Sequence, residues 1–180
     1  MSPVAQSRTY RMILCALFAA LSAVGAFLRV PIPYVPFTLQ TFFVALAGLL
    51  LGKKLGAVSA LVYMAIGLIG IPVFTEGGGI AYVLKPTFGY IVGFVLGAYV
   101  TGAIARKVET PSLGRLIAAV FAGFGVTYLL GMTYFYFMSN FYLGKAIGVG
   151  TVLLYCFLVF VPGNGVMGVI AALVDRKSVV

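Results

Sequence analysis

Long apolar segments alternate with short connections along this 180-residue chain, and the connections hold most of the charged residues. Segments of this length and hydropathy predict helices, because about 20 apolar residues in a helix cross a bilayer. The last apolar segment should be interrupted at Pro162-Gly163, where proline removes a backbone donor and glycine has a low helix preference. We expect one all-α domain over residues 1–180, a bundle of six transmembrane helices at about 10–28, 38–51, 55–69, 87–105, 116–137 and 148–174.

Composition supports an integral membrane protein and argues against several classes of function. The chain is 63% hydrophobic and 8% charged, against roughly 45–50% and 25% in soluble domains, so the surplus apolar surface should face lipid. Histidine is absent, and the acids are only Glu76, Glu109 and Asp175. This inventory argues against metal sites, histidine-based triads and paired-carboxylate hydrolysis. We therefore expect no enzyme, no metal and no cofactor.

Lysine and arginine are distributed unevenly between alternate connections. One set holds nine of them: Arg8, Arg11, Lys53, Lys54, Arg106, Lys107, Arg115, Arg176 and Lys177. The other set holds Arg29, Lys85 and Lys145. The positive-inside rule places the larger set in the cytoplasm, so six spans with both termini cytoplasmic are predicted. The net charge of +9 is therefore assigned to membrane topology and not to nucleic-acid binding, because the charges lie singly or in pairs between apolar segments.

The stretch from residue 70 to residue 90, GIPVFTEGGGIAYVLKPTFGY, is the least helix-like part of the chain between apolar segments. Pro72 and Pro86 each remove a backbone donor, and three glycines follow one another at 77–79. Irregular, polar backbone between membrane spans is tolerated where it is buried in protein or lines a cavity. This stretch is therefore the leading candidate for a ligand site.

On the predicted topology, the three outward connections at 29–37, 70–86 and 161–165 are all rich in proline, glycine and aromatic residues. Each precedes a helix whose outward N-terminus carries about half a positive charge. If they converge, they offer an anion-binding floor to which Lys85 or Arg29 adds a full charge. The aromatic residues available to wall an apolar cavity above it are Tyr34, Phe37, Phe74, Tyr82, Phe88 and Tyr90. The alternative is that these loops only close hairpins.

The first helix carries two pairs of small residues at helical spacing, Ala16 with Ala20 and Ala19 with Ala23. Such pairs let helix backbones approach closely in lipid. The spacing alone leaves two explanations open, which are packing within this chain and docking onto a partner subunit. Glycines repeat at the same spacing over residues 89–97, which predicts close helix packing.

Three motifs, in order along the chain, resemble the BioY family: VPFTLQTFFVALAGLLLG at 35–52, GIPVF…GG…PTFGYIVGF within 70–94, and PGN at 162–164. Members of that family are biotin-specific substrate-binding subunits (S components) of energy-coupling factor transporters. The resemblance covers most of the chain. It implies a six-helix S-component bundle in the cell membrane, with biotin bound by outward loops 1, 3 and 5.

The resemblance also implies partners. The face with Ala16 and Ala20 looks like the family's docking motif for the energy-coupling transmembrane subunit. Two cytoplasmic ATPase subunits complete the usual complex. This chain has no GxxxxGK[ST] phosphate loop, so any ATP hydrolysis must come from those partners.

Two positions depart from the family pattern, and both affect charge. The motif that commonly reads Pro-Gly-Asp, with lysine three residues later, has Asn164 and Met167 here. Before Pro-Thr, where the family commonly has a small residue, this chain has Lys85. We hypothesise that Lys85 pairs with the biotin carboxylate, while Gln40 and Asn164 hydrogen-bond the ureido group. Glycines 77–79 are expected to serve as the hinge of a gate over the ligand.

The residues expected to contact the substrate are Tyr34, Phe37, Gln40, Phe74, Gly78, Gly79, Tyr82, Lys85, Tyr90 and Asn164. Other functions remain open: an S component for a different vitamin, a solitary biotin facilitator that needs no ATPase, and a purely structural membrane protein. The last leaves the Pro/Gly-rich outward loops without a reason. A membrane enzyme is disfavoured, since no nucleophile–base pair can be assembled from these residues.

Overall fold

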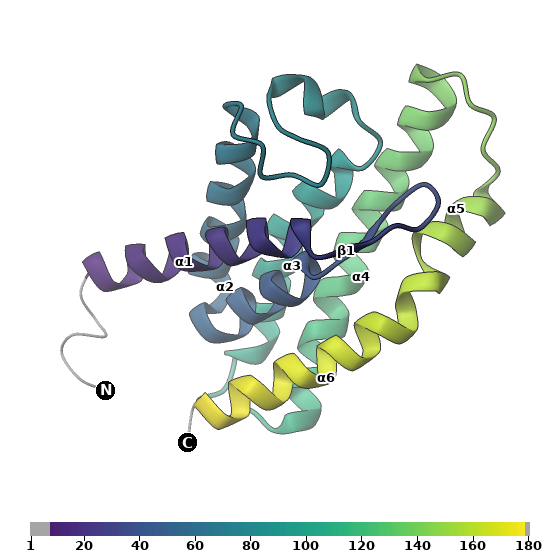
Figure 1. Ribbon diagram of the computed structural model, residues 1–180. Coiled ribbons are helices and arrows are strands. Elements are labelled where there is room, and N and C mark those ends of the chain that lie inside the picture. Colours follow the sequence, from purple (N-terminus) through teal and green to yellow (C-terminus); the bar gives the residue numbers. More distant parts are fainter. Residues whose placement is uncertain (1–7, 179–180) are drawn as a thin grey trace.

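Helices dominate the part of the chain that the computed structural model describes, residues 8–178 (Figure 1). The α-helices are α1 (Arg8–Phe27), α2 (Gln40–Leu68), α3 (Phe88–Ala105), α4 (Leu113–Phe137), α5 (Val149–Cys156) and α6 (Val161–Ser178). The short helical turns are η2 (Ile80–Leu84), η3 (Met138–Tyr142) and η4 (Leu158–Phe160), and a small antiparallel ribbon pairs β1 (Arg29–Val30) with β2 (Phe37–Thr38). The all-α expectation therefore holds apart from this ribbon, which forms where three prolines exclude helix.

Within residues 8–178, five helical stretches are long and apolar enough to cross a membrane: Arg8–Phe27, Gln40–Leu68, Phe88–Ala105, Leu113–Tyr142 and Val149–Lys177. Many of their large apolar side chains stay exposed, among them Met12, Phe27 and Leu129. Exposing such surface to water costs roughly 25 cal/mol per Å², whereas in a bilayer the same surface meets lipid. The structure agrees in this respect with the expectation of a multi-pass membrane protein.

Helix α2 is a hairpin of two arms and not one straight rod. Gly52 interrupts it with φ of 77° and ψ of 179°, which lie outside helix geometry. The Gln40 side-chain amide donates to the Tyr63 hydroxyl over 2.6 Å, whereas residues 23 positions apart in a straight helix lie about 35 Å apart. The two arms correspond to the second and third helices expected from the sequence.

Glycines bring α3 and α4 into backbone contact. A Cβ atom added to Gly93 would lie 2.8 Å from the Thr127 carbonyl oxygen, and one added to Gly97 would lie 2.9 Å from the Gly123 carbonyl oxygen. Neither position leaves room for a side chain, so the two helices meet along the glycine repeat at 89–97. The close packing predicted from the glycine spacing is confirmed.

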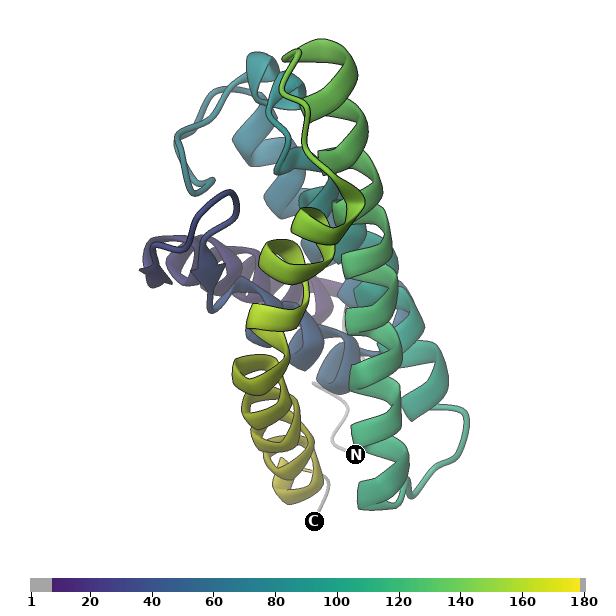
Figure 2. The same cartoon turned by 90° about the vertical axis from the view of Figure 1, so that its right-hand side faces the viewer.

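Helix α1 crosses the bundle at a steep angle to α4, as both views show (Figures 1 and 2). It packs on α2 through a buried face that includes Cys15, Ala19 and Ser22. Near the end of α1, a Cβ atom added to Gly25 would lie 2.8 Å from the backbone nitrogen of Gln40. The ribbon that follows α1 is thereby held beside the first turn of α2.

The last apolar region is interrupted before Pro162-Gly163 and not at it. Helix α5 ends at Cys156, Phe157 leaves helix geometry with φ of −139° and ψ of −66°, and α6 begins at Val161 after η4. The predicted position of the break is therefore wrong. Pro162 lies in the first turn of α6, where its missing N–H removes no intrahelical hydrogen bond and its fixed φ suits a helix start.

The connections 28–39, 69–87 and 138–148 meet at one end of the bundle, here called the loop end; Figure 1 shows the last two at the top. The Arg29 guanidinium donates to the Thr75 carbonyl and ties the first of these loops to the second. The loop end is thus formed by three irregular segments that are far apart in the sequence.

The opposite end, here called the closed end, is densely packed. Arg106, next to the end of α3, donates to the Leu49 carbonyl over 2.8 Å and to the Asp175 carboxylate near the end of α6. The Asp175 side chain is fully buried. A Cβ atom on Gly102 would overlap the Lys53 amide nitrogen. Three helices are therefore fastened together at this end.

Candidate substrate-binding site

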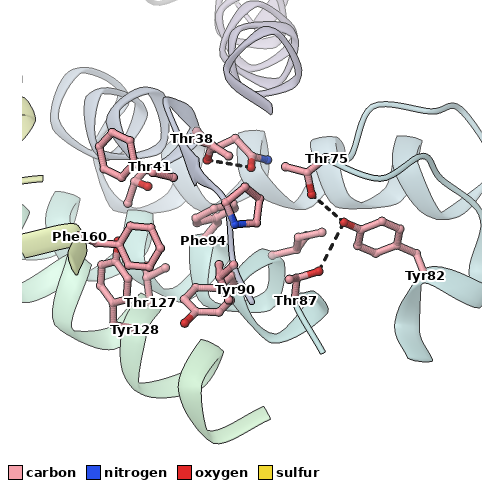
Figure 3. Close-up of a pocket in the computed structure, with 15 residues that line it drawn as sticks. Thr38, Thr41, Thr75, Tyr82, Thr87, Tyr90, Phe94, Thr127, Tyr128 and Phe160 are labelled. Carbon is pink, nitrogen blue, oxygen red and sulfur yellow. Dashed lines mark hydrogen bonds between the residues drawn. The ribbon is translucent and has the colours of Figure 1, made fainter. Parts of the chain in front are cut away.

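A cavity, here called the main cavity, opens at the loop end between the ribbon, the 69–87 connection and helices α2, α3 and α4 (Figure 3). Its empty space, counted with its opening to solvent, is about 560 Å³. It is lined by Val35, Pro36, Phe37, Thr38, Gln40, Thr41, Thr75, Tyr82, Thr87, Tyr90, Ile91, Phe94, Thr127, Tyr128 and Phe160.

Three stacked aromatic rings form one wall of the main cavity. The rings of Phe37 and Phe160 have centroids 5.8 Å apart and planes 13° apart, and those of Phe160 and Tyr128 are 6.0 Å and 26° apart. Phe37 lies against Gly163, where a Cβ atom would approach the ring to 2.6 Å. Four segments therefore meet here to give a flat apolar surface, on which a ring or a thioether packs favourably.

Tyr90, in the first turns of α3, adds a further aromatic face. Its ring meets the Tyr128 ring edge-on, with centroids 5.8 Å apart and planes 80° apart. Its hydroxyl donates to the Cys156 carbonyl over 3.1 Å, at the point where α5 ends. The hydroxyl is thus occupied within the protein, and the ring is what Tyr90 offers to a ligand.

Gln40, the first residue of α2, is a polar group of the wall whose side-chain amide is hydrogen-bonded at both its oxygen and its nitrogen. Its amide oxygen accepts from the Thr38 hydroxyl (3.1 Å), and its amide nitrogen donates to the Tyr63 hydroxyl (2.6 Å), which donates in turn to the Val73 carbonyl (3.0 Å). Gln40 and Tyr63 are both buried. This chain of bonds fixes the orientation of the amide and leaves one amide hydrogen and one oxygen lone pair for a ligand.

A second polar group comes from the 69–87 connection. The Tyr82 hydroxyl lies 3.0 Å from Thr75 Oγ1 and 3.5 Å from Thr87 Oγ1, and Figure 3 shows the two threonine hydroxyls pointing at it from either side. The Tyr82 ring packs on buried Phe74, with centroids 4.6 Å apart. A Cβ atom on Gly67 would overlap the Phe74 ring. The absence of a side chain at Gly67 therefore lets Phe74 pack beneath Tyr82.

The fifteen lining residues of the main cavity include no lysine, arginine, aspartate or glutamate. Its polar atoms are hydroxyl and amide groups, and most of its side chains are buried. A full charge in such a place has no counter-charge and is expensive to desolvate. The main cavity therefore suits the neutral, partly polar portion of a ligand.

The charged groups lie in a neighbouring cavity, here called the vestibule, which shares Thr87 with the main cavity. The vestibule is lined by Tyr34, Glu76, Lys85, Pro86, Thr87, Phe135, Ser139, Leu143, Lys145 and Ile147. Lys85 Nζ forms an ion pair with Glu76 Oε2, and the two side chains are 41% and 47% exposed. The vestibule is thus more exposed and more polar than the main cavity.

Six of the ten residues expected to contact the substrate line these two cavities. Phe37, Gln40, Tyr82 and Tyr90 line the main cavity, and Tyr34 and Lys85 line the vestibule. Tyr34 has a φ of 71°, an uncommon conformation for a residue other than glycine. Its ring lies against the rings of Phe135 and Tyr155, so the first loop reaches across the vestibule to α4 and α5.

The other four line neither cavity. Phe74 supports Tyr82, as described above, and Asn164 is buried behind Tyr128, to whose hydroxyl its side-chain amide donates. A Cβ atom on Gly78 would overlap the Ile71 carbonyl oxygen and lie 3.0 Å from the Gly67 carbonyl oxygen, so this glycine packs against the last turn of α2 and the residues that follow it. Gly79 donates to the Gly67 carbonyl over 2.7 Å. These residues shape the site without bordering either cavity.

The sequence reasoning missed lining residues on four elements: Thr41 in the first turn of α2, Phe94 in α3, Thr127 and Tyr128 in α4, and Phe160 in η4. The available signal was a polar pair, Thr127 and Tyr128, in the middle of a long apolar segment. Polar side chains within a membrane span face protein or a cavity more often than lipid. That signal identifies the face of α4 that lines the cavity.

The alanines of α1 divide between the two explanations left open by their spacing. Ala19 is buried against the protein interior and Ala23 is partly buried, so this pair packs within the chain. Ala16 and Ala20 lie on the exposed side of α1. Only the second pair is available to a partner helix.

Comparisons with known proteins agree with one another. The model of the BioY family matches residues 1–179. A protein of Lysinibacillus sphaericus named "Probable biotin transporter BioY" is 44% identical over 172 residues, which cover 96% of this chain and 88% of that protein. The "Biotin transporter BioY" of Thermotoga maritima is 41% identical over 171 residues, 93% of this chain and 94% of that protein.

A solved structure has the same fold. It is the crystal structure of the S-component for biotin from an ECF-type ABC transporter, and it superimposes with a TM-score of 0.84 at 28% identity, covering 99% of this chain and 94% of that chain. Among the residues that the structure describes, no group of three or more His, Cys, Asp or Glu side chains is placed to hold a metal ion.

Proposed function

The chain belongs to the BioY family, and on this basis we propose that it is the membrane-embedded biotin-binding subunit of an energy-coupling factor importer. It captures biotin at the loop end and delivers it inward together with the energy-coupling module. Transport of this kind changes no covalent bond. It is therefore suited to a chain without histidine and with only three acids.

The uncharged, buried and aromatic-walled main cavity is the observation that carries the proposal. Biotin combines a fused ureido ring with donors and an acceptor, a thioether ring, an apolar chain and one carboxylate. Its bicyclic part is uncharged and has both polar and apolar groups, and the lining of the main cavity has the same character. Its carboxylate is not suited to the main cavity and must lie where charge is available, which points the ligand's chain toward the vestibule.

Within the main cavity, Gln40 is proposed to read the ureido group. Its free amide hydrogen suits the ureido oxygen, and its free lone pair suits a ureido N–H. Because the other half of the amide is held by Thr38 and Tyr63, it cannot turn to serve a ligand of the opposite polarity. A buried polar group left without a partner costs about 1–3 kcal/mol, so this arrangement selects for the ureido pattern.

Asn164 is proposed to act through Tyr128 as a positioning residue. Its amide nitrogen donates to the Tyr128 hydroxyl, and its Oδ1 is one of two buried side-chain polar atoms without a partner in the described part of the chain. Since the hydroxyl accepts from Asn164, its own hydrogen remains free to donate. The Tyr128 hydroxyl then offers a donor to a ligand acceptor within the aromatic wall.

The glycines at 77–79 are proposed to let the 69–87 connection open and close over the ligand. Gly77 and Gly79 have φ of 110° and 98°, values that residues with a side chain rarely adopt. Hinges are commonly a few loop residues that absorb such backbone changes. Opening the loop would expose the Tyr82 side of the main cavity.

The exposed Ala16 and Ala20 are proposed to dock onto the energy-coupling transmembrane subunit, which two cytoplasmic ATPase subunits would drive. Small residues on an exposed helix face permit close approach of a second helix in lipid. With each arm of α2 counted as one crossing, the chain crosses the membrane six times. Both termini are then cytoplasmic, and the loop end faces outward.

Calorimetric titration of biotin into the purified chain in detergent tests the substrate, with riboflavin, thiamine and folate as competitors in parallel. We expect saturable binding of biotin that the other vitamins do not displace. Binding of another vitamin in place of biotin would contradict the assignment of substrate while leaving the transport class intact.

Docking is tested separately from binding. Ala16→Trp with Ala20→Trp should leave biotin binding to the isolated chain unchanged and abolish ATP-dependent uptake in vesicles that contain the partner subunits. A matched variant on the same exposed face of α1, Leu17→Trp, keeps the alanine pair and should retain more uptake. Undiminished uptake by the double variant, or full uptake by the purified wild-type chain alone, would overturn the docking proposal.

A further inference from the structure

Three cations lie on connections of the loop end, and the structure uses them differently. The Arg29 guanidinium donates to the Thr75 carbonyl. The Lys85 ammonium pairs with Glu76. Within residues 8–178, no hydrogen bond or ion pair is formed by the ammonium of Lys145, although it lines the vestibule. Of the three cations, Lys145 is therefore the one whose charged group has no hydrogen-bond or ion-pair partner within residues 8–178.

The position of Lys145 is held by its own loop. Lys145 donates its backbone N–H to the Ser139 carbonyl over 2.9 Å. The Asn140 side chain donates to the carbonyls of Tyr136 (3.0 Å) and Ile147 (3.1 Å) and accepts from the Ile147 N–H (2.9 Å). Asn140 therefore closes the loop on both sides of Lys145. A loop closed in this way presents its lysine from a defined direction.

Charge counting within the vestibule leads to the same residue. Its charged lining residues are Glu76, Lys85 and Lys145. The first two neutralise each other as an ion pair, so the net charge of +1 belongs to Lys145. The vestibule adjoins the uncharged main cavity at Thr87. A ligand with a neutral head in the main cavity and an acidic tail can therefore place the tail in the vestibule, where Lys145 supplies the opposite charge.

We propose that Lys145 receives the carboxylate of the substrate in the vestibule and so distinguishes acidic substrates from their neutral derivatives. This inference rests on the proposed function, because it takes the bicyclic head of biotin to be in the main cavity. It assigns to Lys145 the role that the sequence suggested for Lys85. Lys85 instead forms an ion pair with Glu76, which joins two parts of the 69–87 connection.

The test is calorimetric titration of two probes, biotin and its neutral primary amide, into the full chain. Lys145→Gln should weaken biotin binding about five- to tenfold, which lies between the effect of an exposed ion pair and that of a hydrogen bond to a charged group. It should change binding of the amide less than twofold. Lys145→Arg should retain biotin affinity within about twofold, and the loss in Lys145→Gln should shrink as salt is raised.

Two matched variants isolate the position of the charge. Lys85→Gln combined with Glu76→Gln removes the ion pair but keeps the vestibule at a net charge of +1, so it should weaken biotin binding less than Lys145→Gln does. Lys107→Gln makes the same change in total charge at the closed end, where Lys107 is exposed, and should have no effect. All variants alter exposed or half-exposed side chains, and their thermal unfolding is compared with that of the wild type.

Several results would overturn the inference. One is an equal loss of biotin and amide binding in Lys145→Gln, and another is a large loss in the Lys85/Glu76 double variant with Lys145→Gln unaffected. If the wild type binds biotin and the amide equally well, the carboxylate is not read and this inference fails while the proposed function stands. If the wild type binds neither probe, the proposed function itself fails.

Discussion

The loop end and the closed end each contain an ion pair, and the two pairs differ in almost every physical respect. Glu76 and Lys85 belong to one connection, nine positions apart, and their side chains are 47% and 41% exposed. Arg106 and Asp175 are 69 positions apart, they join α3 to α6, and the Asp175 side chain is fully buried. Exposed pairs contribute about 0–1 kcal/mol, whereas breaking a buried pair costs about 3–5 kcal/mol.

The packing around the pairs differs in the same direction. At the closed end, a Cβ atom on Gly48 would lie 2.7 Å from the Ala98 carbonyl oxygen, and one on Gly56 would lie 2.8 Å from the Gly48 Cα atom. At the loop end, nothing lies within 4 Å of a Cβ atom added to Gly77 or Gly79, which follow Glu76 in the 69–87 connection. Regions of few buried contacts open locally at little cost. The molecule is therefore built to admit a ligand at one end while the other end holds the bundle together.

Breaking the buried ion pair should have the largest effect on stability. Arg106→Gln leaves the buried Asp175 carboxylate without a counter-charge. We expect the free energy of unfolding to fall by about 3 kcal/mol, the lower part of the range for buried pairs, because the Arg106 side chain is 26% exposed. Unfolding is followed by circular dichroism during titration of mixed micelles with sodium dodecyl sulfate.

The control for this prediction removes both charges. Arg106→Met with Asp175→Leu should recover much of the lost stability, since an apolar pair of similar volume often replaces a buried ion pair without cost. An Arg106→Gln variant as stable as the wild type would show that the closed end does not depend on this pair.

Adding a single methyl group at the closed end should have the next largest effect. In Gly102→Ala the new Cβ atom would overlap the Lys53 backbone, so we expect a loss of about 1–3 kcal/mol from overpacking. Gly125→Ala is the matched control, because Gly125 is also a helical glycine and nothing lies within 4 Å of its added Cβ atom. The two variants are compared in the same denaturation assay. Equal stabilities would contradict the view that α2 and α3 touch along their backbones.

Changing the polar wall of the main cavity should affect binding more than stability. Gln40→Leu removes the amide that is proposed to read the ureido group, and we expect biotin affinity to fall about ten- to a hundredfold. Tyr63→Phe removes the same internal hydrogen bond from a residue that does not line the main cavity, so it should reduce affinity less. Calorimetry measures both variants. A larger loss of affinity in Tyr63→Phe than in Gln40→Leu would contradict direct contact between the Gln40 amide and biotin.

Breaking the exposed ion pair should have the smallest effect on stability. Glu76→Gln is expected to change the free energy of unfolding by less than about 1 kcal/mol, and any effect should diminish as salt is raised, because both side chains are open to solvent. The same denaturation assay at low and high salt measures it. A loss as large as that in Arg106→Gln would remove the contrast between the two ends.

Local features of the fold were predictable because each has a local cause. Gly52, between apolar segments, marks the turn of the α2 hairpin, and the glycine repeat at 89–97 marks the contact of α3 with α4. The break in the last apolar region was misplaced at Pro162-Gly163, since the effect of proline depends on where the helix begins. The steep crossing of α1 depends on packing against α2, which the pattern of one segment does not contain.

The candidate site was predictable where it lies in irregular segments and not where it lies in helices. Phe37, Tyr82 and Lys85 stand out because proline and glycine mark their loops. Thr41 and Tyr128 are single polar residues in apolar helices, and they become lining residues only when helices far apart in the sequence meet. The pairing of Arg106 with Asp175 is of the same kind. The sequence identified Arg106 as a cytoplasmic cation and Asp175 as one of three acids. The fold is what places the two side chains together.

Amide hydrogen exchange, followed by mass spectrometry with and without biotin, tests the contrast between the two ends most directly. Without ligand, the loop-end segments 29–38, 70–87 and 138–148 should exchange faster than the closed-end segments 48–56 and 98–106. Saturating biotin should slow exchange in the three loops and leave the closed end unchanged. Biotin protection centred on the closed end, or loops that exchange as slowly as the closed end before biotin is added, would contradict this account.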